Sequence, residues 1–477
     1  MPAVMRAAAV AERAGVPAVA IGGSGFEGMG RAIGKSLGIG HVPIVSYPGV
    51  ILTDDTETFT TKMTDKVAPE VIEALVHEVT TEGALGVNNT DEPAPKDVVF
   101  TGSLDDVQDY FLERGWSDGL PIVPPTVERI EAFLANTDRS PSEVVGVLLP
   151  EQREATVWNV AVNGVMAGCK PEYLPILLAI AECLVDPEFR IQDAGSTPGW
   201  EPLVVLSGRV ADQLYFNSGT GVMRIGRRAN SSVGRFVRLY LRNLPGLRIA
   251  PEQTDQGAIA ASFNVVLAEN EAAVRDLGWP SFRADRGFDD DQSMVTVQSC
   301  VNISAPIYSG GDFPRDHLET LAQIFGNAIG PWAYTGMEFG AWHPLLVLGP
   351  SIARALADHG VGKAEIRAYL AEHMLISVTE LERCAWQVGS TSFRVDALVR
   401  SGALDARYGE SDDPERRVPM CPRAEDISIV IAGNPNRNQS RGYVQNHVQG
   451  VPISRPVVLP ADWNSRIIGS HGPGEST

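Results

Sequence analysis

The sequence predicts an α/β protein, and three observations support this fold class. Within residues 1–82, helical and strand patterns alternate, which is the order of a βαβ unit with parallel strands. Beyond residue 100, apolar strand patterns are mixed with helices and joined by long connections. A chain of 477 residues is also too long for one ordinary domain. We therefore expect an incomplete Rossmann-like βαβ domain followed by a larger α/β or α+β domain.

The N-terminal domain is predicted to cover residues 1–82. Its expected strands are Pro17–Ile21 and Val42–Pro48, and its expected helices are Ala7–Ala14, Gly28–Leu37 and Ala68–Thr81. Two strands cannot make a stable doubly wound sheet. This domain is therefore expected to take the rest of its sheet from elsewhere, through a homo-oligomer or a partner subunit.

A glycine-rich segment follows the first predicted strand. Gly23, Gly25 and Gly28 fit the pattern G-x-G-x-x-G, but the residues at the end of the next strand are Ser46-Tyr47-Pro48. A dinucleotide-binding fold would place an acidic residue there. A tight strand-to-helix turn is therefore favoured over nicotinamide or flavin binding, and the sequence identifies no cofactor.

Residues 83–100 have the Gly, Asn, Asp and Pro composition of a linker, and the large domain is predicted to span residues 101–464. Ser103 is a good N-cap for its first helix. Residues 465–477 are expected to form a disordered tail. The expected strands are Pro202–Gly208, Ala261–Glu269, Ser293–Gln298, Pro344–Gly349 and Asp426–Gly433, and the expected helices include Asp316–Ala328, Ser351–Ala357, Lys363–His373 and Val395–Ser401.

Composition excludes several classes of function. The formal net charge of −20 and a pI near 4.9 argue against a nucleic-acid partner. Five scattered cysteines without a C-x-x-C pair argue against a disulfide framework or a zinc ribbon, and they suit a reducing cytosol. The N-terminus lacks the apolar core of a signal peptide. The most apolar run, Leu174–Val185, is too short to span a bilayer. We therefore predict a cytoplasmic protein with no membrane partner.

The strongest functional pattern lies at residues 217–243, where an arginine-rich loop precedes an amphipathic helix. No acidic residue occurs between Asp212 and Glu252. Helix-start amides and guanidinium groups together form a receptor for a carboxylate or phosphate. The alternative is that these arginines pair with the protein's own acids or with a second subunit. The predicted helix is capped by Asn230 or Ser231, and the predicted substrate-binding residues here are Arg224, Arg227, Arg228, Asn230, Ser231 and Arg235.

Cys169 is the first candidate nucleophile. Lys170 is adjacent, and Pro171 could open a helix whose positive end lies near the sulfur. Both effects would lower the pKa of the thiol. The alternative is a buried apolar residue at a helix junction.

A second group of candidate ligands follows the strand at Asp426–Gly433. Asn434, Asn436 and Arg437 are polar residues just past the carboxyl end of a strand, where open sheets present their ligands. Asparagine-rich strand ends are also common turn formers, so these residues are predicted either to bind substrate or to shape a turn.

Two further residues are candidate acid–base groups. His343 lies between Trp342 and Pro344 in an aromatic context, and Glu269 belongs to the segment AENE. The alternatives are a structural histidine and a carboxylate that neutralises Arg235 or Arg238. Asp289–Asp291 could hold Mg²⁺, although such a run more commonly forms a solvated turn or pairs with an arginine. The eight histidines show no spacing that predicts a metal site.

The run AVAERAGVPAVAIGGSGFEGMGRAIGKSLGIGHVPIVSYPG resembles the back half of the UGSC-family (seleno)proteins, over residues 7–80. That family carries a selenocysteine or cysteine upstream of this helix, whereas no cysteine precedes Ala7 here. From SDGLPIVPPT to the end, about three-quarters of the chain resembles the large uncharacterised domain that is often linked to these proteins, through motifs such as AVNGVMAGCKPEYLPILLA and RRANSSVGRFVRL. The resemblance implies thiol- or selenol-assisted cleavage or reduction of a carbon–heteroatom bond.

The sequence therefore favours an enzyme, of the lyase or oxidoreductase class, that acts on a small anionic substrate. Two alternatives remain open. One is a non-catalytic binding or assembly subunit for a thiol-bearing partner, and the other is a metal-dependent hydrolase or lyase.

Overall fold

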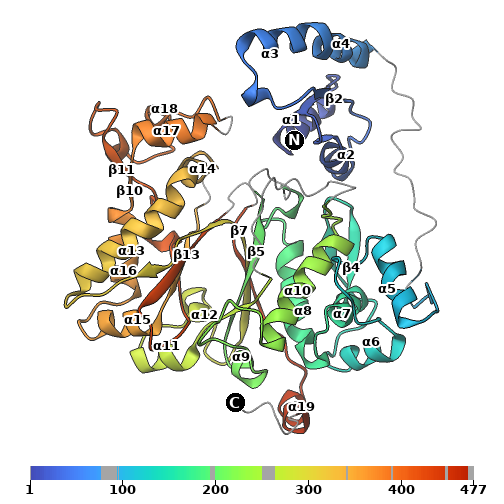
Figure 1. Ribbon diagram of the computed structural model, residues 1–477, viewed down its shortest axis with the longest axis vertical. Helices are drawn as coiled ribbons and strands as arrows, with labels where there is room; N and C mark the ends of the chain where they lie inside the picture. Colours follow the sequence, from blue (N-terminus) through green and yellow to red (C-terminus); the bar gives the residue numbers. More distant parts are fainter. Residues whose placement is uncertain are drawn as a thin grey trace.

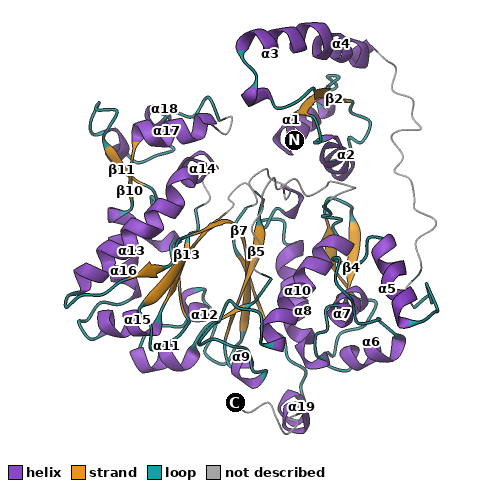
Figure 2. Ribbon diagram, viewed as in Figure 1, coloured by secondary structure: helices purple, strands orange, loops and turns teal. Residues whose placement is uncertain are grey.

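The computed structural model describes residues 2–76, 94, 96–193, 199–249, 264–339, 342–387, 390–445 and 450–470. Within these residues the protein is an α/β structure in which helices surround parallel and antiparallel strands (Figure 2). The predicted fold class is therefore confirmed. No helix in the described ranges has both the length and the apolar character needed to cross a membrane.

The N-terminal domain contains a two-stranded parallel sheet. Strand β1 (Ala20–Gly23) pairs with β2 (Ile44–Tyr47), and helix α2 (Glu27–Ser36) connects them. Helices α1 (Pro2–Arg13) and α2 pack on one face of the sheet, and η2 (Met63–Val67) with α4 (Ala68–Val76) packs on the other. The parallel βαβ order agrees with the sequence analysis, while the Rossmann-like assignment stays a prediction.

The end of this domain is more helical than the sequence indicated. Helix α3 (Thr56–Lys62) precedes α4 and begins after Asp55, whose side chain accepts a hydrogen bond from the Thr58 backbone N–H at 2.7 Å. Helix α4 begins at Ala68, as predicted, but α3 and η2 lead directly into it, and residues 77–81 lie outside the described residues.

The main sheet of the large domain has the order β12-β9-β13-β7-β5-β6. Its outer pairs, β12 with β9 and β5 with β6, are parallel, and the inner pairs are antiparallel. Strands β14 and β8 add to β7 and β13, respectively. The strands are β5 (Glu201–Ser207), β6 (Leu267–Ala268), β7 (Met294–Ile303), β8 (Ile307–Tyr308), β9 (Leu345–Leu348), β12 (Ser428–Ile431), β13 (Gln439–Gln445) and β14 (Ile453–Pro456).

Two groups of helices cover different halves of this sheet (Figure 1). Helices α7 (Val157–Met166), α8 (Leu174–Val185) and α10 (Arg228–Asn243) share a core with β5 and β7. Helices α13 (Pro314–Ile329), α15 (Pro350–Ala357) and α16 (Lys363–His373) share a second core with β9 and β12. The opposite face of the sheet forms a third core around Phe282 of α12 (Phe282–Asp285).

The remaining elements surround this frame. The Asn270 backbone N–H donates to the Ile431 carbonyl at 2.7 Å, so the ends of the edge strands β6 and β12 meet. The other helices and strands are α5 (Leu104–Glu113), α6 (Val127–Leu134), β3 (Val144–Leu148), β4 (Arg153–Thr156), α9 (Val210–Gln213), α11 (Glu271–Leu277), α14 (Ala333–Phe339), β10 (Leu375–Ser377), α17 (Val378–Gln387), α18 (Val395–Arg400), β11 (Arg417–Pro419) and α19 (Trp463–Ser470).

Several predicted boundaries change. Helix α19 occupies residues 465–470, which were predicted to be disordered, because Trp463 is buried against the core formed with α7 and α8. Residues 471–477 and most of the predicted linker lie outside the described residues. The strand predicted over Ala261–Glu269 is reduced to β6, and residues 261–263 are not described. Ser103 does cap α5, within a capping box with Asp106.

Gly234 sets the distance between α10 and the chain that leads into β6. A methyl group on Gly234 would lie 2.6 Å from the Val265 backbone nitrogen and still closer to the Asn264 carbonyl group. We predict that Gly234→Ala destabilises the protein by about 2 kcal/mol or more, because backbone must move. The measurement is urea unfolding.

Gly326→Ala is the matched control, since Gly326 also lies inside a helix but its nearest neighbour would be Met374 Cβ at 3.5 Å. That variant is expected to be neutral or more stable, because alanine favours helix over glycine. Equal destabilisation by the two substitutions would contradict the close packing of α10.

Candidate functional site

The amphipathic helix predicted around residue 233 is α10, and its apolar side is fully buried. Val233, Phe236 and Tyr240 are each 0% exposed. However, the helix begins at Arg228, before the predicted caps, and no side chain caps it. Helix α10 therefore starts with backbone N–H groups that have no side-chain acceptor.

Asn230 and Ser231 have other roles than capping. Asn230 is 0% exposed, accepts from the Asn217 N–H at 2.7 Å, and donates to the Asn217 and Val266 carbonyls at 3.0 and 2.9 Å. The Ser231 hydroxyl accepts from the Gly226 N–H at 3.3 Å. The predicted substrate-binding role of Asn230 is therefore wrong, because its amide is buried and fully used in joining three segments.

The arginines farther along α10 are engaged by the protein itself. Arg235 forms a two-pronged pair with Asp118, with nitrogen–oxygen distances of 2.7 and 2.9 Å. Arg238 lies 3.5 Å from buried Glu201, and Arg242 donates to the Gly115 carbonyl. The alternative of internal pairing is therefore correct for Arg235 and Arg238, and Arg235 is not a free substrate receptor.

Asp118 was not singled out from the sequence, because it lies 117 residues before its partner. Burial raises the pKa of its carboxyl, but the hydrogen bonds and charge of Arg235 outweigh that effect and lower it. Glu269 was the candidate partner for Arg235 or Arg238. Its hydrogen bonds and ion pairs are made with Ser207, Phe282 and Lys363 instead.

The arginines before the first turn of α10 remain at the surface. Arg224, Arg227 and Arg228 are exposed. Arg228 Nε donates to the Gly168 carbonyl at 3.1 Å, and no hydrogen bond or ion pair of the Arg224 guanidinium occurs with the described residues. These cations flank an uncapped helix start, which is the arrangement expected of an anion receptor.

Cys169 lies beside this helix start, as its neighbour Gly168 bonds to Arg228. Its predicted activation is wrong: burial raises the pKa of the Cys169 thiol to about 12, even though Ser232, Arg228 and Arg235 act in the opposite direction. The thiol is only 5% exposed and belongs to the core of α7, α8 and α10. Cys169 is therefore a packing residue in this conformation.

The loop after β12 adjoins the arginine loop. The Gly433 N–H donates to the Ser218 carbonyl at 2.9 Å, so two segments that the sequence analysis treated separately meet. Asn434 accepts from the Asn436 N–H at 2.8 Å and shapes a turn, and the exposed Arg437 donates to the Asn436 carbonyl at 2.9 Å. The contacts of Asn434 and Asn436 are those of turn formers.

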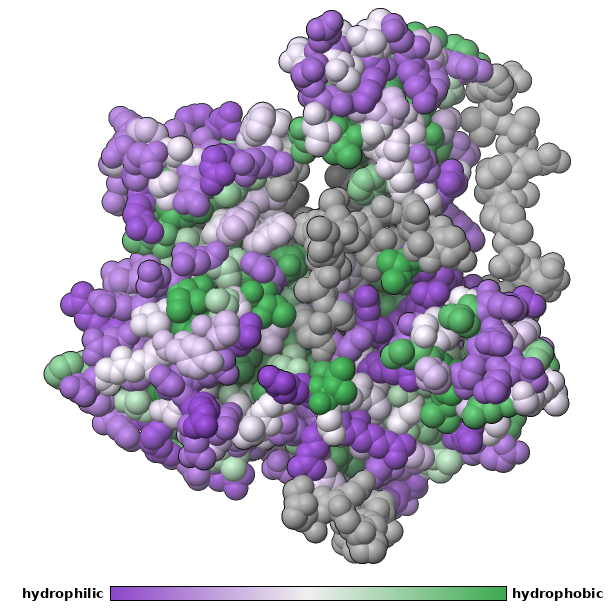
Figure 3. Space-filling view, in the orientation of Figure 1, coloured by the Kyte–Doolittle hydropathy of each residue, from purple (hydrophilic) through white to green (hydrophobic). Residues whose placement is uncertain are grey.

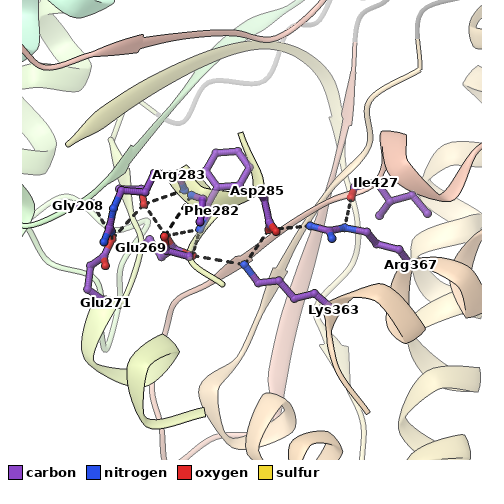
Figure 4. Close-up of polar contacts among 12 residues, drawn as sticks. Gly208, Glu269, Glu271, Phe282, Arg283, Asp285, Lys363, Arg367 and Ile427 are labelled. Atoms are coloured by element: carbon purple, nitrogen blue, oxygen red, sulfur yellow. Dashed lines mark hydrogen bonds and ion pairs between the residues drawn. The ribbon is translucent and has the colours of Figure 1, made fainter. Parts of the chain in front are cut away.

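Glu269 belongs to a different, buried polar network (Figure 4). Its carboxylate accepts from the Ser207 hydroxyl at 2.6 Å and from the Phe282 N–H at 2.8 and 2.9 Å, and Lys363 Nζ lies 3.9 Å away. Lys363, which is 3% exposed, also contacts Asp285 at 3.0 Å. Glu269 therefore touches the ends of β5 and β6, α12 and the first turn of α16.

The same network extends in both directions. Glu271 accepts from the Gly208 N–H at 2.6 Å and pairs with Arg283, while Asp285 pairs with Arg367 at 2.7 Å. The carboxyl groups of Glu269, Glu271 and Asp285 are thus matched by the cations of Arg283, Lys363 and Arg367. Because each buried charge has a partner of opposite charge, the cost of removing these groups from water is offset. The charged groups can therefore be buried where the two helix-covered halves of the large domain meet.

Glu269 has an unusual protonation equilibrium. Burial raises the pKa of its carboxyl to about 7, with Lys363 and the Ser207 hydroxyl opposing the shift. A carboxyl group that titrates near neutral pH is suited to proton transfer. Its side chain is 0% exposed, so a substrate would reach it only after the network opens.

His343 lies in a third place, at one end of the main sheet. Burial and the charges of Arg286 and Arg423 lower the pKa of its imidazole to about 4, so the ring is neutral at pH 7. The Gln298 side chain donates to the His343 carbonyl. The sequence analysis did not select Glu201, Cys300 and Gln445, which lie side by side on β5, β7 and β13 and are each at most 3% exposed.

The structure therefore joins Cys169 to the start of α10 but leaves Glu269 and His343 in separate surroundings. In the described part of the chain, no three His, Cys, Asp or Glu residues form a group that could hold a metal ion. Asp289–Asp291 do not make one. Asp290 instead lies 3.6 Å from Arg283, in agreement with the predicted arginine partner.

Comparison of the chain with protein-family models, curated proteins and solved structures found no match. The site must therefore be interpreted from its own geometry.

We predict that Glu269→Gln reduces the dependence of stability on pH. The pKa of about 7 in the folded protein lies above the ordinary value of 4.5, so protonation of Glu269 favours folding. This contribution is complete below about pH 4.5 and is lost as the pH rises through about 7, and it amounts to at most ~3 kcal/mol. The measurement is the free energy of unfolding in urea at several pH values.

The exposed Glu372→Gln substitution on α16 is the control and should leave the wild-type profile unchanged. If Glu269→Gln also kept that profile, the buried carboxyl would not be the titrating group.

We also predict that Cys169 resists alkylation in the folded protein. A rise of the thiol pKa from 9.0 to about 12 lowers the thiolate fraction near pH 8 by roughly 1000-fold. Iodoacetamide should therefore modify Cys169 at least ~100-fold more slowly in the native state than in urea. Mass spectrometry of the peptides would follow each cysteine, and Cys384, at 9% the most exposed of the five, should react first. Rapid native modification of Cys169 would restore it as a candidate nucleophile.

Proposed function

We propose that the protein binds a small carboxylate or phosphate anion at the start of α10. We propose further that it is an enzyme, or a subunit of an enzyme, that acts on this anion as its substrate. The α10 anion site consists of Arg224, Arg228 and the backbone N–H groups of the first helical turn. Arg227 is exposed in the same loop, and Arg437 is exposed in the adjoining loop.

The observation that carries this proposal is the uncapped start of a 16-residue helix next to exposed arginines. A helix start without a side-chain cap leaves N–H groups that water or an anion must satisfy. The helix dipole and two permanent positive charges favour the anion. Internal acids engage Arg235 and Arg238, and the Gly115 carbonyl engages Arg242, so these arginines do not compete for the ligand.

The chemistry of the reaction is proposed from the resemblance to UGSC-family proteins, namely thiol-assisted cleavage or reduction of a carbon–heteroatom bond. All five cysteines of this chain are free but buried. Burial raises the pKa of Cys169, Cys183, Cys300, Cys384 and Cys421, which keeps each of them as a thiol. The reacting thiol would then come from another polypeptide.

That burial favours a second candidate function, a non-catalytic subunit that binds the anionic substrate for a thiol-bearing partner. We propose a cytoplasmic location, because free cysteines suit a reducing compartment. The third possibility is a metal-dependent hydrolase or lyase. The described residues contain no cluster of metal ligands that would support it.

We predict that Arg224→Ala weakens the binding of inorganic phosphate or malonate at least tenfold, which corresponds to about 1.4 kcal/mol. The substitution removes a guanidinium group that no described internal acid engages, so stability should stay within about 0.5 kcal/mol of wild type. Isothermal titration calorimetry at low ionic strength would measure the affinity.

Arg315→Ala is the matched control, because Arg315 is 80% exposed on α13 and pairs only weakly at the surface with Glu319. It should leave anion affinity unchanged. Equal affinities of wild type and Arg224→Ala, or no measurable binding of either anion, would overturn the proposed site.

A further inference from the structure

The N-terminal domain exposes an unusual amount of apolar surface. Of the 25 large apolar side chains that are exposed in the described part of the chain, eleven lie between residues 4 and 76. In the space-filling view (Figure 3), the side of this domain that faces the viewer is largely hydrophilic, and apolar residues lie along its lower edge and at its upper right. In a protein with large cores elsewhere, such clustering marks an interaction surface.

The exposure follows from the small size of the sheet. Ile21 in β1 lies on the same sheet face as Val45 and Tyr47, which pair across from Ile21 and Gly23 in β2. Val67 of η2 and Val71 of α4 pack with Val45 and Tyr47, which are 6% and 0% exposed, but Ile21 stays 36% exposed. The second face of β1 is therefore incompletely covered.

Helix α4 shows the same mismatch. Val67 at the end of η2 and Val71 in α4 pack against the sheet, whereas Leu75, on the same helical stripe, is 44% exposed and Val76 is 74% exposed. Neighbouring strands are only about 4.8 Å apart, so a two-stranded sheet is narrow. The apolar stripe of the helix is longer than this sheet can cover.

Strand β1 also has a backbone edge that no other described strand pairs with. Ala20 and Ser24 donate to the Pro43 and Tyr47 carbonyls of the β2 segment, at 2.9 and 3.0 Å. Because strand residues alternate in direction, the N–H and C=O groups of Ile21 and Gly23 point away from β2. The Gly23 carbonyl also accepts from the Phe26 N–H at 3.2 Å, which leaves its second lone pair available.

This edge lacks the usual protection against pairing. Its sequence, Ala-Ile-Gly-Gly, contains no charge and no proline, and its register with β2 has no bulge. Two glycines in succession also leave room for a second backbone to approach.

We propose that β1 pairs antiparallel with β1 of a second copy of this chain, about a two-fold axis at Gly22. Ile21 of one copy then exchanges both backbone hydrogen bonds with Gly23 of the other, and Gly23 does the same with Ile21. The edge is self-complementary under this symmetry, which is why a second copy fits it.

The resulting sheet has four strands in the order β2-β1-β1-β2. This meets the minimum of three strands that gives a sheet independent stability. The added strand also supplies apolar surface beside Ile21 and the exposed end of the α4 stripe, which neither strand of one copy covers.

The test uses the full chain at about 10 µM in native mass spectrometry and light scattering. The wild type should have twice the 51.2 kDa mass of one chain. Ile21→Lys places a charge on the joined face, and Gly23→Pro removes an outward N–H without affecting the bonds to β2. Each variant should raise the dimer dissociation constant at least tenfold. Val458→Lys is the control, because Val458 is 66% exposed outside the N-terminal domain.

A β1 variant could lose the dimer simply because it misfolds. Hydrogen exchange of the wild type tests the same contact without a substitution. The Ile21 and Gly23 amides should exchange slowly at high protein concentration and quickly after dilution, whereas the Ala20 amide, bonded to Pro43, should stay protected in both. A monomeric wild type, a dimer insensitive to both β1 variants, or concentration-independent exchange at Ile21 and Gly23 would each overturn the proposal.

Discussion

The arrangement of the functional surface depends on one buried side chain, Asn230. Its amide joins the first turn of α10 to the loop at Asn217 and to the chain at Val266, which leads into β6. A buried amide that loses one such partner leaves an unsatisfied polar group, at a cost of about 1–3 kcal/mol. The position of the arginine loop relative to the helix start is therefore fixed by the core. It does not rely on the loop's own surface contacts.

Charge pairing then divides the arginines of this region into two groups. Those within the helix face acids that other parts of the fold supply, as Asp118 does for Arg235 and Glu201 does for Arg238. Arg224 and Arg228, around the helix start, are exposed and have no ion pair with an acid among the described residues. Charge pairing also occurs in the network around Glu269, where three carboxyl groups and three cations lie together between the two helix-covered halves. In an acidic chain, cations left without an internal acid are candidates for a ligand from solution.

Periodic patterns in the sequence were sufficient for much of the fold. The helix Lys363–His373 was predicted with its observed limits, and the apolar strands β5, β9 and β12 were placed to within two residues. Strand β13 was missed, although it lies inside the sheet, because it contains Gln439, Arg441 and Gly442 where an apolar run is expected. Its backbone is held by β7 and β9, a tertiary effect that propensity does not show.

The site was less predictable because its chemistry depends on burial and on distant partners. Around Cys169 the sequence showed the neighbouring Lys170 and a helix start, both of which favour a thiolate. The structure adds a core that encloses the sulfur, and burial reverses the direction of the pKa shift. Asp118 and Lys363 gain their roles only through folding. Asp118 pairs with Arg235, 117 residues away in the sequence, and Lys363 contacts Glu269 and Asp285, which lie on other elements.

The location of a bound anion tests the account most directly. Crystals soaked in selenate, an analogue of phosphate and sulfate with an anomalous signal, would report that location without knowledge of the substrate. The account predicts a selenium peak about 4 Å from the Arg224 and Arg228 guanidinium groups and the first-turn amides of α10, so that the selenate oxygens lie within about 3 Å of these donors, with the Asp118–Arg235 pair intact. A peak at Arg235 with Asp118 displaced, or no peak at the start of α10, would contradict it.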